Sequence, residues 1–204
     1  MPPSFTEGGE KVFDVLIVGG GQGGLDITFQ LVRERVNNIL TIGMADSDLE
    51  GPWNTYARMP ILRSPKEVNG AGLNIPSLAF QSWYEAFYGL KAWNKMGKTP
   101  TNLWAKYLVW YSKVLNLPVR NKVRLDAFEP FQDIQKVSLT CLTTNKKIIF
   151  TRKIVLATRI ETSGEWRSPS ISSKISKEFW CHSSEFIDFD SLAGKHVAVL
   201  GAGA

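Results

Sequence analysis

Three glycines near the start of the chain have the spacing of a phosphate-binding turn. Gly19, Gly21 and Gly24 fit the pattern G-x-G-x-x-G, and Gln22 and Gly23 occupy its variable positions. In such a turn the glycines allow a tight bend, close approach of a pyrophosphate to the backbone, and close packing of a helix on a strand. The first N–H groups of the following helix then direct partial positive charge at the phosphates. The motif therefore predicts that a dinucleotide binds here.

The segments on either side of this turn predict a strand–helix–strand unit. Residues 13–18 are nearly all apolar, as expected of a strand that is buried on both faces. Apolar residues then recur at spacings of three and four through residues 25–36, which is the period of a helix, before Asn37 and Asn38 end it. Residues 39–42 form a second apolar run. The glycine motif alone is weak evidence for a dinucleotide site. Its position between a predicted strand and a predicted helix, with a second strand after them, makes the evidence strong.

The second strand lacks an acid that is typical of dinucleotide sites. An Asp or Glu at the tip of this strand, about twenty residues after the glycines, ordinarily binds the ribose of the adenosine. Here Gly43 occupies that tip. Asp46, Asp48 and Glu50 in the following loop are alternatives, each of which requires a different backbone path. The sequence does not choose among them.

The rest of the chain predicts a long loop, helices and a small antiparallel sheet. Residues 44–120 begin as an irregular loop and continue with helical patterns over residues 82–90 and 102–115. Apolar residues alternate with a period of two in residues 122–150, as in an antiparallel meander. The apolar run 153–157 is expected to return to the parallel sheet. The predicted fold class is α/β, a Rossmann-like parallel sheet carrying a small antiparallel β-meander.

The end of the chain predicts a second glycine-rich turn. An apolar run at residues 197–200, expected as a strand, precedes Gly201 and Gly203. We therefore expect the sequence to be the front part of a longer protein, truncated at the start of a second Rossmann domain.

Composition excludes several classes of protein. The chain is 44% hydrophobic and 21% charged, which is typical of a globular domain. No apolar run is long enough to span a bilayer, and a net charge of +5 indicates little about partners. The basic stretch 146–153 flanks an apolar core, so we expect solvated strand ends and no nucleic-acid site. Cys141 and Cys181 lack the spacing of a metal site or redox pair. We expect a soluble, cytoplasmic protein without a metal.

The order of these features resembles the flavoproteins with two dinucleotide-binding domains, in which the first turn binds FAD and the second binds NADPH. Within that group the chain most resembles the flavin-containing monooxygenases. Residues 50–53 resemble their Gly-Gly-x-Trp segment, and residues 53–67 resemble the segment that leads past the flavin ring. Thr158 belongs to their Ala-Thr-Gly segment, although Arg159 here replaces the glycine. Gly43 is the second departure from the family pattern.

The resemblance implies an FAD site in this chain and an NADP(H) site in the full-length protein. The candidate contacts of the flavin ring are apolar or aromatic, Trp53, Tyr56 and Met59, or cationic, Arg58, Arg63 and Lys66. The alternatives are that the aromatic residues form a small local core and that Arg63 and Lys66 are solvated at the surface. Thr158 would lie beside FAD, and Gly201 and Gly203 beside NADP(H). The implied organisation is a flexible leader (1–12), an FAD-binding domain (13–190) with a loop and helical insertion (44–120) and a meander (122–150), and the start of an NAD(P)-binding domain (191–204).

By the same resemblance, the longer protein oxidises NADPH and oxygenates a small molecule, whereas catalysis by these 204 residues alone stays open. An N-hydroxylating amine monooxygenase is a close alternative, because residues 62–65 resemble that group. A single-domain NAD(P) dehydrogenase is disfavoured by the meander and the second turn. A third alternative is a truncated or decayed, non-catalytic chain that binds a nucleotide weakly or not at all; Gly43, Arg159 and the abrupt end of the sequence support this alternative. The sequence does not predict the oligomeric state.

Overall fold

The computed structural model of the chain contains two compact units, Met1–Ser163 and Gly164–Ala204. Each unit is described by itself. The structure describes residues 5–6, 8–54, 57–68, 70–132, 138–158, 168–183, 185 and 187–201.

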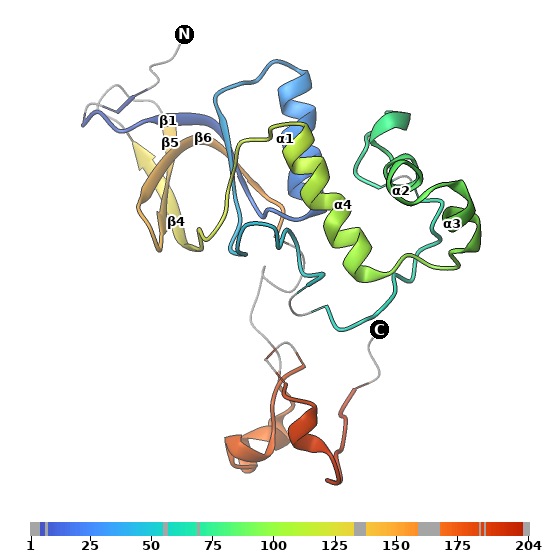
Figure 1. Ribbon diagram of the computed structural model, residues 1–204. Coiled ribbons are helices and arrows are strands. Elements are labelled where there is room, and N and C mark those ends of the chain that lie inside the picture. Colours follow the sequence, from blue (N-terminus) through green and yellow to red (C-terminus); the bar gives the residue numbers. More distant parts are fainter. Residues whose placement is uncertain are drawn as a thin grey trace. The chain divides into compact units, whose positions relative to one another are not determined.

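Six strands in the first unit form one mixed sheet in the order β3-β2-β1-β6-β5-β4 (Figure 1). The parallel strands are β1 (Val12–Val18), β2 (Ile39–Ile42), β3 (Val119–Arg120) and β6 (Ile148–Leu156). Strands β5 (Ser138–Thr144) and β4 (Leu125–Gln132) continue the sheet beyond β6 in antiparallel fashion. The α/β fold class with an antiparallel meander is therefore confirmed.

Strand β6 joins two segments that the sequence pattern separates. Residues 148–150 were expected in the meander and 153–157 in the parallel sheet, but both belong to one strand. Thr151 explains this continuity, since it pairs with Phe13 of β1 on one side and with Thr140 of β5 on the other. Strand β3 was not expected, because two residues are too few to show a period.

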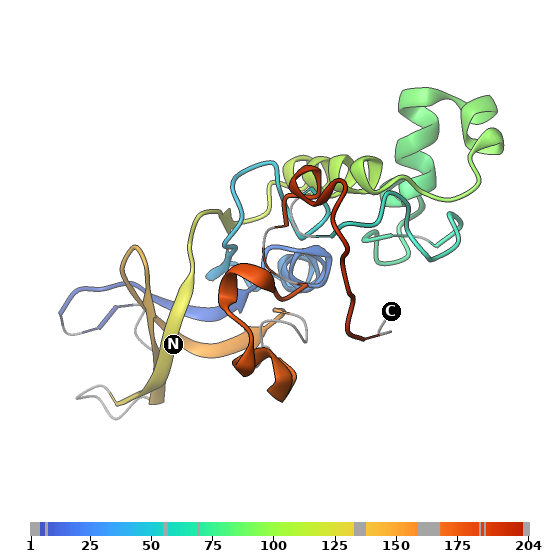
Figure 2. The ribbon, with the colours of Figure 1, turned by 90° about the horizontal axis from the view of Figure 1, so that it is seen from below.

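Three of the four α-helices among the described residues follow the predicted patterns, with different ends. The four helices are α1 (Gln22–Arg33), α2 (Phe80–Tyr88), α3 (Leu90–Lys95) and α4 (Thr101–Val114). Helix α1 ends before Asn37, because Arg35 adopts a positive φ of 61° that no helix can continue. The pattern over residues 82–90 corresponds to α2, which ends before Gly89 with its φ of 83°, whereas α3 was not predicted. Helix α1 lies between the sheet and α4 (Figure 1 and Figure 2).

An aromatic core joins the helices of the first unit. It is centred on Phe80, whose ring centroid lies 5.3 Å from that of Trp104 and 5.4 Å from that of Tyr107. Tyr107 and Tyr111 are fully buried, so the aromatic residues along one face of α4 pack in this core. A second apolar cluster involves the sheet, with Leu16, Ile42 and Leu142 among its buried members.

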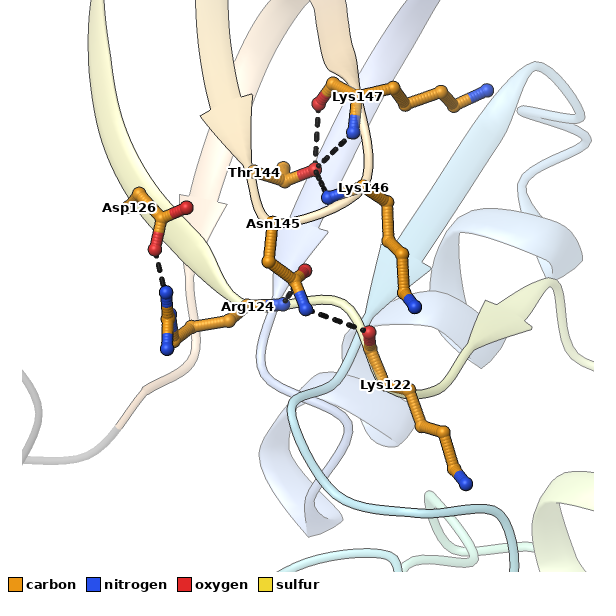
Figure 3. Close-up of polar contacts among 7 residues, drawn as sticks. All are labelled: Lys122, Arg124, Asp126, Thr144, Asn145, Lys146 and Lys147. Carbon is orange, nitrogen blue, oxygen red and sulfur yellow. Dashed lines mark hydrogen bonds and ion pairs between the residues drawn. The ribbon is translucent and has the colours of Figure 1, made fainter.

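The hairpin between β5 and β6 is closed by side-chain hydrogen bonds (Figure 3). The Thr144 hydroxyl accepts from the backbone N–H groups of Lys146 and Lys147 and donates to the Lys147 carbonyl oxygen at 2.6 Å. The side-chain oxygen of Asn145 accepts from the backbone N–H of Arg124 at 2.8 Å, which ties the turn to the segment before β4. Lys146 and Lys147 are exposed, as the sequence predicts.

The second unit contains short 3₁₀ turns. They comprise Ser170–Lys174, Lys177–Phe179 and Asp190–Leu192. The predicted strand at residues 197–200 is not formed, and Val197, Val199 and Leu200 are exposed. A strand requires a neighbour for its backbone hydrogen bonds, and the described part of this unit contains no other strand.

Within the described ranges, every helix is too short or too polar to cross a bilayer. The domain boundary at residue 190 stays a prediction.

Candidate functional site

The carboxyl ends of the four parallel strands form the edge of the sheet that carries the candidate site. The residues following β1 and β2 are hydrogen-bonded to their neighbours, since Gly19 N–H donates to Ile42 O at 2.8 Å and Gly43 N–H donates to Arg120 O at 2.9 Å. The chain leaves β1 toward β2 on one side, while β6 pairs with its other side. Ligands of open α/β sheets bind at such a change of direction, outside the carboxyl ends of the strands.

The glycine-rich turn leaves β1 in a conformation that requires two of its glycines. Gly19 has a φ of 121°, and a β-carbon there would overlap the backbone of Ala157, which follows β6. A β-carbon at Gly24 would overlap the carbonyl oxygen of Gly19. Helix α1 consequently packs directly against the end of β1.

The start of α1 offers backbone N–H groups at this turn. Gly21 is the N-cap residue and makes no side-chain hydrogen bond to the helix. The N–H groups of Gln22 and Gly23 lie in the first turn, where no carbonyl within the helix can accept from them. Gly23 has open space where its β-carbon would be. The turn can therefore bind the phosphates of a nucleotide through the backbone.

The loop after β2 approaches the glycine-rich turn closely. A β-carbon at Gly43 would lie 3.4 Å from the Cα of Gly20, and one at Gly21 would lie 3.6 Å from the Cα of Gly51. Gly43, which departs from the family pattern, therefore lies close to the backbone of the glycine-rich turn. The loop 44–54 thus passes beside the N-terminus of α1.

Two of the three alternative acids are engaged with lysines at the surface. Asp46 lies 3.4 Å from Lys122 Nζ, and Asp48 lies 2.5 Å from Lys113 Nζ. Both carboxylates are more than half exposed. Hydrogen bonding with Asp48 is the main cause that raises the pKa of Lys113, and the charge of Glu50 contributes.

Glu50 differs from these two acids in its burial. Only 7% of the residue is exposed. One oxygen, Oε1, lies 3.5 Å from Nδ2 of Asn121, which also donates to the backbone oxygen of Asp46 at 3.0 Å. The other oxygen, Oε2, is buried without a hydrogen-bond partner among the described residues. A buried carboxylate oxygen without a donor is costly, so it marks a place where a ligand could donate.

Trp53 links the glycine-rich turn to the aromatic core. Its indole lies 3.1 Å from the position that a β-carbon on Gly51 would take, and that position lies 3.7 Å from the Cα of Gly21. Its ring also packs edge-to-face on Trp104 of α4, with centroids 6.4 Å apart. Of the predicted apolar contacts, the structure therefore brings Trp53 near the turn.

The segment after Trp53 is held at the start of α4. Arg58, Met59 and Arg63 are exposed, and Thr101 Oγ1 donates to the backbone oxygen of Met59 at 2.6 Å. Helix α4 connects this segment to the residues beside the glycine-rich turn, because Trp104 of α4 packs on Trp53.

The remaining candidate site residues of the sequence lie in different parts of the structure. Lys66 donates to the backbone oxygens of Trp93 and Met96 at 2.8 and 2.7 Å, so it caps α3 and is not available as a cation for a flavin ring. The backbone N of Thr158 lies 3.4 Å from the β-carbon position of Gly19, so Thr158 adjoins the turn. Gly201 is exposed in the second unit. Tyr56, Arg159 and Gly203 lie outside the described residues.

Asp26, on α1, is a titratable residue that the sequence analysis missed. Burial raises its pKa to about 7, and its Oδ1 atom has no hydrogen-bond partner among the described residues. Burial, followed by smaller effects that include the charge of Asp26, raises the pKa of Tyr107 and Tyr111 on α4. In the sequence, the burial of Asp26 is indicated only by its position between the apolar helix residues Leu25 and Phe29.

A pocket lies at the end of β3, beside Asn121. Its volume is about 380 Å³, and its lining residues are Arg120, Asn121, Val123, Lys146, Lys147 and Ile149. Val123 and Ile149 are buried, whereas the lysines of the hairpin are exposed (Figure 3). The sequence could not reveal this pocket, because the residues that meet there are more than twenty positions apart. Across the described residues, no group of three or more potential metal ligands is found.

Comparisons with known proteins agree with this geometry. The chain is 42% identical over 196 residues to FAD-dependent urate hydroxylase of Xanthomonas campestris pv. campestris. The match covers 95% of this chain, and the chain spans 41% of the length of that protein. No protein-family model matches the chain.

Solved structures share the fold at low sequence identity. An FAD-bound cadaverine monooxygenase of desferrioxamine biosynthesis from Erwinia amylovora has a TM-score of 0.63 and 15% identity, covering 86% of this chain and 41% of that one. Ornithine hydroxylase from Pseudomonas aeruginosa has a TM-score of 0.59 and 16% identity, covering 71% and 38%. The chain is therefore similar in sequence to an FAD-dependent hydroxylase and has the fold of the FAD/NAD(P)-binding flavin monooxygenases.

Proposed function

We propose that this chain binds FAD and forms the FAD-binding part of a hydroxylase that acts on a small molecule. The observation that carries the proposal is the turn between β1 and α1. There Gly24 packs on Gly19, and the N-terminus of α1 carries no side-chain cap. Backbone N–H groups at an uncapped helix start favour a pyrophosphate, because they combine free donors with partial positive charge.

The residues around the turn fit the other parts of FAD. Trp53 offers an aromatic surface beside the turn, and the exposed Arg58, Met59 and Arg63 extend from the same loop. Thr158 follows β6, on the opposite side of β1 from the loop after β2. When bound, FAD would supply the redox chemistry, while the protein positions it. NADP(H) is proposed as the reductant of the full-length protein, with Gly201 and Gly203 in its site.

The sequence relative suggests the substrate class. Because 42% identity extends over nearly the whole chain, we propose hydroxylation of a small molecule and urate as the first compound to test. N-hydroxylation of an amine is the second candidate, supported by the fold shared with ornithine and cadaverine monooxygenases. NADPH oxidation by the intact gene product, with urate or ornithine added, distinguishes them. We also propose a cytoplasmic location and no nucleic-acid partner.

FAD binding is tested with two glycine variants. We expect the purified chain to take up FAD with visible flavin bands, and Gly21→Val to abolish binding because its branched side chain would occupy the space over the helix start. Gly21 has a φ of −82°, which valine can adopt, so folding measured by circular dichroism should persist. Gly97→Ala is the matched control, since nothing lies within 4 Å of the added carbon and Gly97 lies outside the glycine-rich turn. Absence of flavin bands in the unmodified chain would favour a decayed, non-catalytic protein. Flavin retention by Gly21→Val would contradict the assignment of the turn.

A further inference from the structure

The buried carboxylate of Glu50 is the strongest unexplained polar group in the molecule. Glu50 is the one charged residue among the buried residues that the structure describes, and its Oε2 atom has no hydrogen-bond donor among the described residues. We infer that Glu50 takes the place of the acid missing at the tip of β2 and accepts hydrogen bonds from the ribose hydroxyls of the adenosine half of FAD. This inference rests on the proposed function.

The location of Glu50 supports this role. A β-carbon on the next residue, Gly51, would lie 3.7 Å from the Cα of Gly21 at the start of α1. Asn121, which lies 3.5 Å from Oε1 of Glu50, directly follows β3. Glu50 is therefore held between the start of α1 and the residue that follows β3.

The other two acids of the loop do not share these properties. Asp46 and Asp48 are exposed and already lie beside Lys122 and Lys113. An exposed, lysine-paired carboxylate gains little from a further hydrogen bond, because water and the ammonium group already satisfy it. The structure thus selects Glu50 from the three alternatives that the sequence leaves open.

The two hydroxyls of a ribose can supply the hydrogen-bond donors that the Glu50 carboxylate lacks. An ionised carboxylate accepts hydrogen bonds only, and the two ribose hydroxyls can both donate to it. Asn121 acts as a positioning residue, since its amide N–H is directed at Oε1 and leaves Oε2 for the ligand. Hydrogen bonds to a charged acceptor are stronger than neutral ones, so loss of the charge should have a measurable effect.

The test compares two nucleotides in two variants by isothermal titration calorimetry. ADP carries the adenosine ribose and the pyrophosphate of FAD, and 2′,3′-dideoxy-ADP lacks both ribose hydroxyls. We expect the unmodified chain to bind ADP about tenfold or more tightly than the dideoxy nucleotide, as a charge-assisted hydrogen bond would provide. In Glu50→Gln this preference should fall to about twofold or less, because the amide keeps the shape and loses the charge. The matched control Asp48→Asn should retain the full preference.

Each outcome decides the inference. A full preference for ADP in Glu50→Gln would overturn it, as would the absence of any preference in the unmodified chain, a result that does not depend on the folding of a variant. The proposed function is tested separately by FAD: if the unmodified chain binds neither FAD nor ADP, both fail. If it binds FAD without preferring ADP over the dideoxy nucleotide, only the role of Glu50 fails.

Discussion

Gly24 in α1 packs so closely on Gly19 that a β-carbon on Gly24 would overlap the Gly19 carbonyl oxygen. Gly19 marks the end of β1, and Gly24 lies in the first turn of the helix, so this single approach sets the distance between the strand and the helix. The phosphate binding that we propose for the turn depends on that distance.

We therefore predict that Gly24→Ala lowers the free energy of unfolding by roughly 1–3 kcal/mol, the range for overpacking in a tight interior. The obstacle is backbone, which cannot rotate away as a flexible side chain could. Urea denaturation measures the change. Gly23→Ala is the control, since its added carbon meets open space and should leave stability unchanged or raise it by about 0.4–1 kcal/mol. Equal stability of the two variants would contradict the close packing.

The hydroxyl of Tyr107 connects three segments of the helical part. It accepts from the backbone N–H of Ala71 at 3.0 Å and donates to the carbonyl oxygen of Leu78 at 2.7 Å. Tyr107→Phe would leave both backbone groups without this partner in a buried place. We expect a loss of about 1–3 kcal/mol in the free energy of unfolding, measured by thermal or urea denaturation.

Tyr111, one turn further along α4, is the matched control for this prediction. Its hydroxyl is buried with no hydrogen-bond partner among the described residues. Removing an unpaired buried hydroxyl removes a desolvation cost. Tyr111→Phe should accordingly be as stable as the unmodified chain or more stable, and a loss equal to that of Tyr107→Phe would refute the distinction.

Asp26 predicts a defined pH dependence of stability. Burial raises its folded-state pKa to about 7, whereas the pKa of an unfolded Asp is about 3.9. Between these values the folded state binds the proton and the unfolded state does not, so this carboxyl makes stability fall as pH rises from about 4 to about 7. The loss of stability that ionised Asp26 causes reaches its full size above pH 7.

We expect Asp26→Asn to be more stable than the unmodified chain at pH 8 by about 1–2 kcal/mol, a value reduced for partial solvent screening. At pH 4 the benefit should vanish. Urea denaturation of both proteins at pH 4, 6 and 8 gives the difference, in which other titrating groups cancel. A difference independent of pH would show that Asp26 ionises normally in the folded state.

The parts of the fold that depend on local pattern were predictable from the sequence. The buried strand, the turn of Gly19–Gly24 and the following helix occupy adjacent residues, so composition and period suffice to assign them. Strand β3 depends instead on pairing with β2, and its two residues carry no period of their own. The division between α2 and α3 depends on the conformation of Gly89, which a helical pattern does not reveal.

The candidate site was predictable to the same extent. The sequence located the glycine-rich turn and narrowed the ribose-binding acid to three residues, but only the fold distinguishes buried Glu50 from Asp46 and Asp48. Asn121 and Asp26 were missed because their significance comes from neighbours distant in the sequence. Lys66 was one candidate cation for the flavin, but it binds backbone oxygens at the end of α3, about thirty residues away.

A final prediction concerns the two positions that compete for the ribose. A β-carbon at Gly43 would lie 3.4 Å from Gly20, an ordinary contact, so Gly43→Glu should fold. If Glu50 already accepts from the ribose, a second carboxylate beside it adds repulsion, and Gly43→Glu alone should change the dissociation constant of FAD by less than about twofold. In the Glu50→Gln background the same substitution should tighten FAD binding by about tenfold, since one charge-assisted hydrogen bond is restored. Flavin fluorescence titration of the four proteins measures this coupling. Equal gains in both backgrounds would mean that positions 43 and 50 act independently, and that Glu50 does not contact the ribose.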